Sequence, residues 1–327
     1  MAPQDPRALT PAQRAEHVKR RARDLGFDGV GITHLDPPPH GDALDRWLGT
    51  GMAGTMRYMH RQAKRRKRPA TILEGAIRAV VMTRGYHTPD PPPTPGTGRV
   101  AKYARGRDYH TALRSPLDAV RSTLIQLGAT PRRTRSYVDA GPVPERELAQ
   151  RAGLGWIGKN TMLLAPERGS YFFLAAILTD LELAPDPPFA ADRCGTCTRC
   201  LDACPTGAFP EPRVLDATRC ISYLTIEHRG DFPPGAPSTG EWLFGCDVCQ
   251  EVCPWNAKFA RAANDPVLAP DPKRATVPLD EFEGMTEPAF ADRYGWTALE
   301  RPGLPGLRRN ARAVRAHVTR EPTCPKE

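Results

Sequence analysis

The chain has 327 residues, enough for two or three domains, and contains no run of 18 or more apolar residues, which excludes a predicted membrane-spanning helix. Its N-terminal cations Lys19, Arg20 and Arg21 lie within an amphipathic helical pattern and precede no apolar run, so we expect no export signal and a cytoplasmic protein. The formal net charge of +9 favours an anionic partner.

An N-terminal domain of mixed helices and strands is predicted for residues 1–188. Helical periodicity predicts helices over residues 11–25, from Ser115 to a stop at Gly128, and over residues 145–151. Apolar runs predict strands at residues 30–32, 79–82, 136–138 and 171–178. Ser115, Pro116 and Asp118 have the pattern of a capping box. The proline-rich segment 184–189 marks the end of this domain.

Basic residues are concentrated in three runs. They are Arg61, Lys64, Arg65, Arg66, Lys67 and Arg68, then Arg132, Arg133 and Arg135, and finally Arg308, Arg309, Arg312, Arg315 and Arg320. Three such runs in a basic chain indicate a polyanion such as nucleic acid as a partner. Any single run is equally consistent with a solvated surface.

Residues 103–110 bring together side chains that can hydrogen-bond a polar substrate or a cofactor. These side chains are Tyr103, Arg105, Tyr109 and His110. The alternative is the start of a helix that is capped by Asp108 and places its aromatic rings in the core.

A carboxylate at a strand end, Asp139, is followed by a glycine-rich turn. The candidates for cofactor binding in this turn are Gly155, Trp156, Ile157, Gly158, Lys159 and Asn160. Glycines let backbone amides approach a ligand, and the lysine and asparagine can hold its polar groups. The spacing matches neither a Walker loop nor a dinucleotide fingerprint, so a structural turn is equally consistent with it. Asp139 alone is also consistent with a helix N-cap.

Eight of the nine cysteines fall in two runs with the ligand spacing of a two-cluster bacterial ferredoxin. The runs are Cys194-x2-Cys197-x2-Cys200-x3-Cys204-Pro205 and Cys220-x25-Cys246-x2-Cys249-x3-Cys253-Pro254. Because the proline turns the chain away after each fourth cysteine, that cysteine is expected to reach the other cluster. We therefore expect two 4Fe-4S clusters, one bound by Cys194, Cys197, Cys200 and Cys253, the other by Cys204, Cys220, Cys246 and Cys249. With both clusters the net charge falls to about +5.

Structural zinc and disulfides are the alternatives for these cysteines, but neither explains the paired Cys-Pro endings. Cys324 is left over. The iron-sulfur domain is predicted to cover residues 189–262. Its 25 residues between Cys220 and Cys246 include Ser222, Tyr223, Thr225, His228 and Trp242, and are expected to link the second cluster to a redox partner in the same protein. Residues 263–327 are predicted to form a small helical cap.

Six segments resemble the epoxyqueuosine reductase family and together span residues 18 to about 260. They are residues 26–32 (Gly-Phe-Asp-Gly-Val-Gly-Ile), 51–59, 104–110, 153–160 (Gly-Leu-Gly-Trp-Ile-Gly-Lys-Asn), 220–227 and 245–256. The combination is specific, whereas the cysteine runs alone fit many iron-sulfur proteins.

The resemblance implies an α+β fold with a nitroreductase-like cobalamin-binding domain, a two-cluster ferredoxin-like domain and a short helical C-terminal cap. It implies an enzyme that reduces epoxyqueuosine to queuosine at the wobble position (34) of tRNA, with electrons passing through two 4Fe-4S clusters to cobalamin. Asp139 matches the family's proton donor. The glycine-rich turn, Ser222 and Asp247 match segments that surround cobalamin, and the polar groups of residues 103–110 suit a corrin rim.

The expected tRNA contacts are the basic residues Arg61, Lys64, Arg65, Arg66, Lys67, Arg308 and Arg309. Longer family members add helical repeats that help to grip tRNA, and residues 304–310 are a proline-interrupted counterpart of the family's basic segment. We further expect an external low-potential electron donor of the flavodoxin or ferredoxin type, no membrane partner, and a monomer.

Two other functions use the same features. A cobalamin-dependent reductive dehalogenase would follow the same electron path to a small halogenated substrate, but such enzymes usually carry a twin-arginine export signal and need no basic runs. A ferredoxin module fused to a binding domain would pass electrons to a separate partner, and tight cobalamin binding would argue against it.

Overall fold

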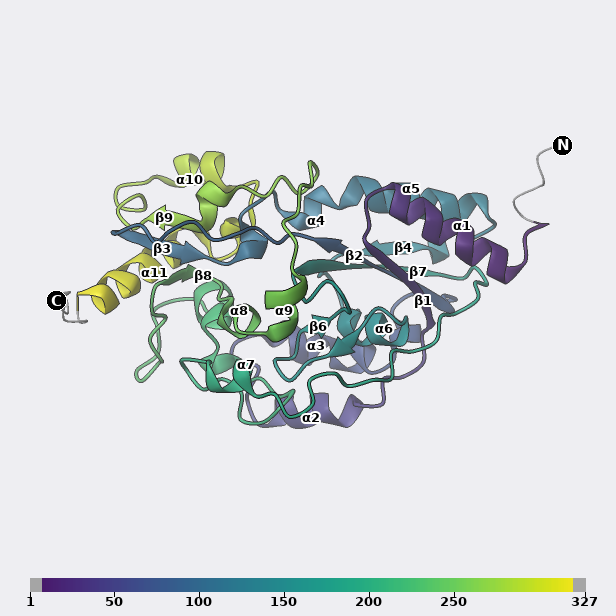
Figure 1. The fold of residues 1–327 in the computed structure, drawn as a ribbon, viewed down its shortest axis with the longest axis horizontal. Coiled ribbons are helices and arrows are strands. Elements are labelled where there is room, and N and C mark those ends of the chain that lie inside the picture. Colours follow the sequence, from purple (N-terminus) through teal and green to yellow (C-terminus); the bar gives the residue numbers. More distant parts are fainter. Residues whose placement is uncertain (1–7, 320–327) are drawn as a thin grey trace.

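The computed structural model describes residues 8–319, so Arg320 and Cys324 lie outside the described residues. Its centre is a four-stranded antiparallel sheet with the strand order β1-β2-β7-β4 (Figure 1). The strands are β1 (Gly29–His34), β2 (Arg78–Gly85), β4 (Arg135–Tyr137) and β7 (Phe172–Thr179). All four predicted strands are confirmed. The six central residues of β2 are buried, because helices cover both faces of the sheet.

Helices α1 (Pro11–Asp24) and α5 (Arg114–Gln126) lie side by side on one face, and α6 (Glu145–Arg151) packs on the other (Figure 1). A capping box between Thr10 and Gln13 begins α1, and Gly26, with φ +90°, follows its end. The capping box expected at Ser115 is wrong. A single-turn helix, α4 (Tyr109–Ala112), directly precedes α5, so Leu113 occupies the cap position.

Glycine in β1 lets α6 approach the sheet closely. A Cβ atom at Gly31 would lie 2.1 Å from the carbonyl oxygen of Ala152, which caps the end of α6. This close contact sets the position of α6 against the sheet.

A second sheet joins distant parts of the chain. Its strands β3 (Thr97–Val100), β8 (Trp242–Phe244) and β9 (Thr276–Pro278) have the order β8-β3-β9. With α10 (Glu287–Tyr294) and α11 (Gly303–Val318) they enclose a core that includes Phe244, Phe282 and Leu307. This core takes residues from all three ranges predicted as domains, and the C-terminal segment supplies a strand in addition to helices.

The eight cysteines lie in a region of loops and short helices, α7 (Arg199–Asp202), α8 (Val248–Glu251) and α9 (Pro254–Phe259). This region packs beside α2 (Gly41–Gly49), α3 (Arg57–Arg66) and the hairpin of β5 (Trp156–Ile157) and β6 (Leu163–Leu164) (Figure 1). A π-helical turn, Tyr223–Glu227, lies between Cys220 and β8, and the Tyr223 hydroxyl accepts the Thr55 backbone N–H at 2.8 Å. No helix within residues 8–319 is long and apolar enough to cross a bilayer.

Candidate active site

The first group of cysteines forms from both runs. Burial raises the pKa of the Cys200 thiol, and the nearby Cys253 and Cys194 raise it further. Cys253 itself lies beside Cys194 and Cys197. The last cysteine of the second run therefore joins the first three cysteines of the first run.

The second group contains the other four cysteines, Cys204, Cys220, Cys246 and Cys249. Burial raises the pKa of Cys246 to about 12, and the nearby Cys220 and Cys204 contribute to the shift. Cys249 lies beside Cys246 and Cys220. All eight are free thiols, and no three or more His, Cys, Asp or Glu side chains within residues 8–319 are arranged to hold a single metal ion.

The glycine-rich turn packs against the cysteine loops. The Trp156 indole N–H lies 3.4 Å from Cys194 Sγ, and Lys159 Nζ donates to the carbonyl oxygens of Gly195 and Cys197 at 2.7 and 2.9 Å. Asn160 Nδ2 donates to the Cys249 carbonyl at 3.2 Å. The polar groups of this turn that were expected to hold a cofactor therefore hold the two cysteine groups in place.

Glycine in this turn is required by packing. A Cβ atom at Gly155 would lie 2.0 Å from the Leu164 carbonyl oxygen, and one at Gly158 would lie 2.6 Å from Leu164 Cδ1. Both glycines let β5 pair closely with β6. Ile157 lies in the same hairpin and is half-buried.

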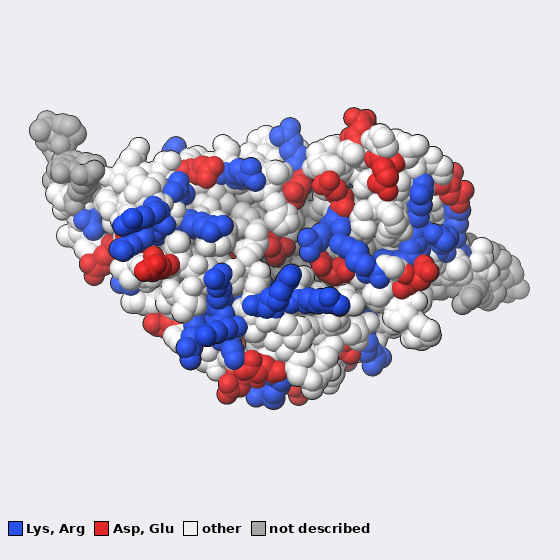
Figure 2. All heavy atoms as spheres, turned by 180° about the vertical axis from the view of Figure 1, so that it is seen from behind, with Lys and Arg blue, Asp and Glu red and all other residues white. Residues whose placement is uncertain are grey.

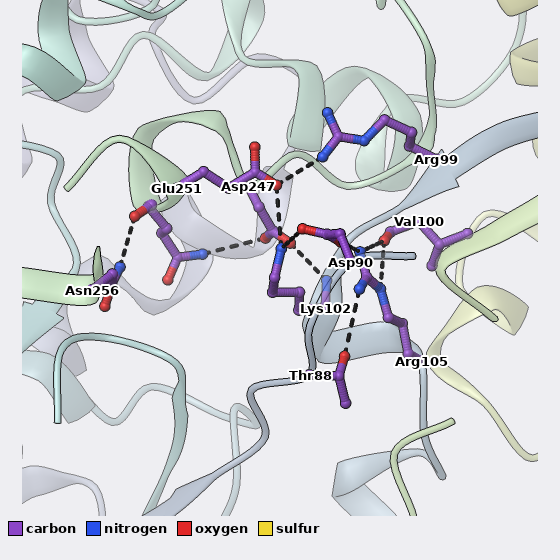
Figure 3. A network of polar contacts seen from close by, with 10 residues as sticks. Thr88, Asp90, Arg99, Val100, Lys102, Arg105, Asp247, Glu251 and Asn256 are labelled. Atoms are coloured by element: carbon purple, nitrogen blue, oxygen red, sulfur yellow. Dashed lines mark hydrogen bonds and ion pairs between the residues drawn. The ribbon is translucent and has the colours of Figure 1, made fainter. Parts of the chain in front are cut away.

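A buried polar network anchors the second cysteine group to the N-terminal domain (Figure 3). Asp247, 1% exposed, accepts the Lys102 backbone N–H at 2.7 Å, and burial raises its pKa to about 6. Lys102 Nζ bonds Asp90 and Glu251 at 2.5 and 3.2 Å. These contacts fix α8, with Cys249, against the segment that leads to Tyr103.

Arg105 belongs to this network and is 0% exposed. Its guanidinium donates to the Val100 carbonyl and the Thr88 hydroxyl and pairs with Asp90 at 2.6 Å (Figure 3). The prediction that Arg105 binds a cofactor is wrong, because all of these donors are used inside the protein.

Asp139 lies just beyond β4 with an exposed side chain and a left-handed φ of +46°. Its carboxylate accepts a hydrogen bond from the Tyr109 hydroxyl, and its backbone N–H donates to Glu145 Oε1 at 2.9 Å. Tyr109 is buried and stacks on Phe173, with ring centroids 4.3 Å apart. Burial and the Asp139 charge raise the pKa of Tyr109, so the phenol stays protonated and donates.

Tyr103 lies between this carboxylate and the second cysteine group. Its ring is 6.1 Å from the Tyr109 ring in an edge-on arrangement, and its Cε1 lies 3.6 Å from the position that a Cβ would occupy at Gly245. It also packs in the small cluster that includes Cys246. Tyr103 and then Tyr109 therefore lie in turn between the second cysteine group and Asp139.

Further polar groups surround Asp139 from several elements. Arg301 pairs with Glu227 at 3.1 Å. Burial and the Glu227 charge raise the pKa of the Tyr58 hydroxyl, and the Arg301 charge lowers it. His110 stacks on Tyr109, and although burial works against its charged form, Asp108 at 2.8 Å raises its pKa. Sequence reasoning missed the roles of Tyr58 and Arg301, because they lie far from residue 139 in the sequence. It also missed Glu145, although only six residues separate it from Asp139.

The predicted helix start at Asp108 is confirmed, since its side chain caps α4 through the His110 backbone N–H. Two cavities of about 620 Å³ lie elsewhere, and neither has Asp139 in its lining. Among the residues that line the first are Arg107, Arg274 and Trp296, and among those of the second are Arg84, His87 and Arg261. Ser222 begins the π-helical turn that contributes Glu227.

The predicted tRNA contacts on α3 divide into exposed cations and half-buried cations that are bonded to other parts of the protein. Arg61, Lys64 and Arg65 are on or near the exposed surface of α3, whereas Arg66 donates to the Gly141 and Val143 carbonyls and Lys67 pairs with Asp45 at 2.5 Å. Figure 2 shows lysine and arginine side chains gathered in groups on one face, with acidic side chains between them.

The prediction that Arg309 binds tRNA is wrong. It is 7% exposed, and its guanidinium donates to the carbonyls of Leu224, His228 and Gly230. Arg308 likewise donates to the Phe282 and Met285 carbonyls. Both arginines hold α11 to neighbouring segments, and Pro305 lies in the first turn of α11 without interrupting it.

Comparison with known proteins gives a consistent family. Residues 193–256 match the family model "4Fe-4S double cluster binding domain", and residues 66–140 match "Epoxyqueuosine reductase QueG, DUF1730". An epoxyqueuosine reductase of Gloeobacter violaceus is 41% identical over 311 residues, which cover 93% of this chain and 96% of the relative.

Two solved structures are also similar. A crystal structure of epoxyqueuosine reductase with an epoxyqueuosine-modified tRNA-Tyr stem loop has a TM-score of 0.84 and 33% identity, over 92% of this chain and 80% of that one. The enzyme from Bacillus subtilis, solved with its aspartate catalytic loop swung out of the active site, has a TM-score of 0.82 and 32% identity, over 92% and 81% of the two chains.

Proposed function

The chain belongs to the epoxyqueuosine reductase family and is an oxidoreductase. We propose that it reduces epoxyqueuosine to queuosine at position 34 of tRNA, with electrons passing through two 4Fe-4S clusters to cobalamin and with Asp139 as the proton donor. The single observation that carries this proposal is the line of side chains from the second cysteine group through Tyr103 and Tyr109 to Asp139.

We propose that the clusters have crossed ligands. The proximity of Cys253 to the first run, and of Cys204 to Cys220 and Cys246, supports this assignment. The nearness of Cys249 to Cys200 also supports it, because it places the two groups side by side for one-electron transfer. The packing of Tyr103 near Cys246 supports the second group as the one nearer to Asp139.

The residues around Asp139 fit a corrin by their chemistry. Tyr58 and Tyr103 offer aromatic surface, while Arg301, His110 and Ser222 offer groups that hydrogen-bond amides. We propose that these residues hold cobalamin, which when bound supplies the low-potential electron chemistry for opening the epoxide.

Asp139 has the position that a proton donor needs. Its side chain is exposed, and the Tyr109 hydroxyl bonds one of its two carboxylate oxygens. Opening an epoxide leaves an alkoxide-like oxygen. The Asp139 carboxylate must first take up a proton from solvent, and in this acid form it can protonate that oxygen, which speeds such a step by roughly 100-fold to 10,000-fold.

The exposed cations of α3 are proposed to contact phosphates of the tRNA stem. A relative was crystallised with a modified tRNA stem loop, which agrees with this role. A low-potential flavodoxin or ferredoxin is the proposed electron source, and we propose that the protein acts as a monomer in the cytoplasm.

The test is anaerobic reconstitution with iron, sulfide and cobalamin, followed by a visible spectrum and turnover of an epoxyqueuosine-containing tRNA stem loop. We expect corrin bands in addition to cluster absorption, and conversion to queuosine with a chemical reductant. A protein with both clusters that neither binds the corrin nor forms queuosine would contradict the proposed function and would be an electron-transfer module.

A further inference from the structure

The loop that carries Asp139, residues 139–144, has little means of holding its own shape. Its sequence is Asp-Ala-Gly-Pro-Val-Pro, and the two prolines have no backbone N–H to donate. Asp139 and Gly141 both have left-handed backbones, with φ +46° and +79°. A left-handed aspartate is disfavoured unless its surroundings hold it, so contacts from outside the loop decide where the carboxylate points.

Besides Tyr109, which bonds the Asp139 carboxylate, two side chains outside the loop bond its backbone. Glu145, the first residue of α6, accepts the Asp139 backbone N–H through Oε1 at 2.9 Å. Arg66, at the end of α3, donates to the Gly141 and Val143 carbonyls at 3.1 and 3.4 Å. Each end of the loop is thus tied to a helix.

The glutamate is suited to accept this bond as a neutral acid. Burial and the charge of Asp139 raise the pKa of Glu145 to about 8, while Arg66 and Arg146 act in the opposite direction. A neutral carboxyl group keeps a carbonyl oxygen that accepts an N–H. It also avoids placing a second negative charge beside the Asp139 carboxylate.

We propose that Glu145 is a positioning residue, which holds the Asp139 carboxylate in place by bonding the backbone N–H of Asp139. This inference rests on the proposed role of Asp139 as proton donor. Glu145 acts through the backbone, because the Asp139 carboxylate is bonded by Tyr109 and Glu145 bonds the amide. It is therefore distinct from a proton relay, in which Glu145 would hand a proton to Asp139.

Three substitutions separate positioning from proton relay. Glu145→Gln keeps a neutral side chain of the same shape with an acceptor oxygen, but has no acidic proton. Glu145→Ala removes the acceptor. Glu145→Asp keeps a carboxyl group and a residue suited to a helix start, yet its side chain is one methylene shorter and withdraws the oxygen from the amide.

Hydrogen exchange of the peptide that contains residues 138–145, in anaerobic holoprotein, reports the loop without any turnover. We expect faster exchange in the alanine and aspartate variants and wild-type exchange in the glutamine variant. Single-turnover queuosine formation should fall about 10-fold to 100-fold in the first two and stay near wild type in the third. Iron content, corrin content and tRNA affinity should be unchanged in all three, which checks the fold.

Two results would overturn the proposal. A glutamine variant that is as slow as alanine, with a protected loop, would make Glu145 a proton relay. If the alanine and aspartate variants both kept wild-type exchange and rate, the hydrogen bond from the Asp139 N–H to Glu145 would not hold the loop in place. If Asp139→Asn turned over normally, the proposed proton donor would fail, yet the exchange experiment would still judge whether Glu145 holds the loop.

Discussion

Asp139→Asn isolates proton delivery from every other property of the site. The amide keeps an oxygen that accepts the Tyr109 hydroxyl and leaves the backbone bond to Glu145 in place. Asparagine adopts a left-handed φ as readily as aspartate, and the exposed side chain leaves no cavity. We therefore expect a folded protein with both clusters, bound cobalamin and normal tRNA affinity.

The expected loss is in the chemical step. General acid catalysis contributes roughly 100-fold to 10,000-fold, equivalent to about 3–5 kcal/mol of activation free energy. Single-turnover conversion of epoxyqueuosine tRNA, started by a chemical reductant and followed by nucleoside analysis, measures it directly. Asp118→Asn, on the exposed side of α5, is the matched control and should behave as wild type. A near-normal rate for Asp139→Asn with intact cofactors would refute the assignment and direct attention to Tyr109 and His110.

Cys200→Ser should lower iron from about eight to about four per chain, while Cys324→Ser should leave it unchanged by iron and sulfide analysis. Arg61, Lys64 and Arg65 can be replaced together by alanine. This change should weaken tRNA binding and reduce the steepness of log affinity against log salt by about 2–3, measured by fluorescence titration. Arg309→Ala should destabilise the protein by at least about 2 kcal/mol, because three carbonyls lose a charged donor. The salt dependence of its tRNA binding should stay the same as in the wild type. Because the pKa of Glu145 is raised to about 8, the folded protein binds a proton that the unfolded chain has released, so stability should fall as pH rises from about 5 to 8. Glu145→Gln should flatten that fall in Tm, and an unchanged pH dependence would contradict the assignment.

The sequence was sufficient for features that depend on local spacing. Cysteine spacing and the prolines after Cys204 and Cys253 predicted two groups of thiols, because a short run of ligands can wrap one cluster only in a few ways. Hydrophobic periodicity located the helices and strands of the main sheet, since burial on one face repeats at a fixed interval. The position of Asp139 at a strand end followed from the same pattern.

Only the tertiary structure decided which polar residues are free to act. Arg105, Arg309 and Arg66 look like ligand-binding cations in the sequence, yet backbone carbonyls from distant segments use their guanidinium groups. The same holds for Lys159, which binds the cysteine loops. A buried charge requires partners wherever the fold supplies them, and sequence distance does not reveal those partners. For this reason the cysteines and Asp139 could be predicted from the chain alone, whereas the roles of Tyr103 and Tyr58 depend on segments that meet only in the folded protein.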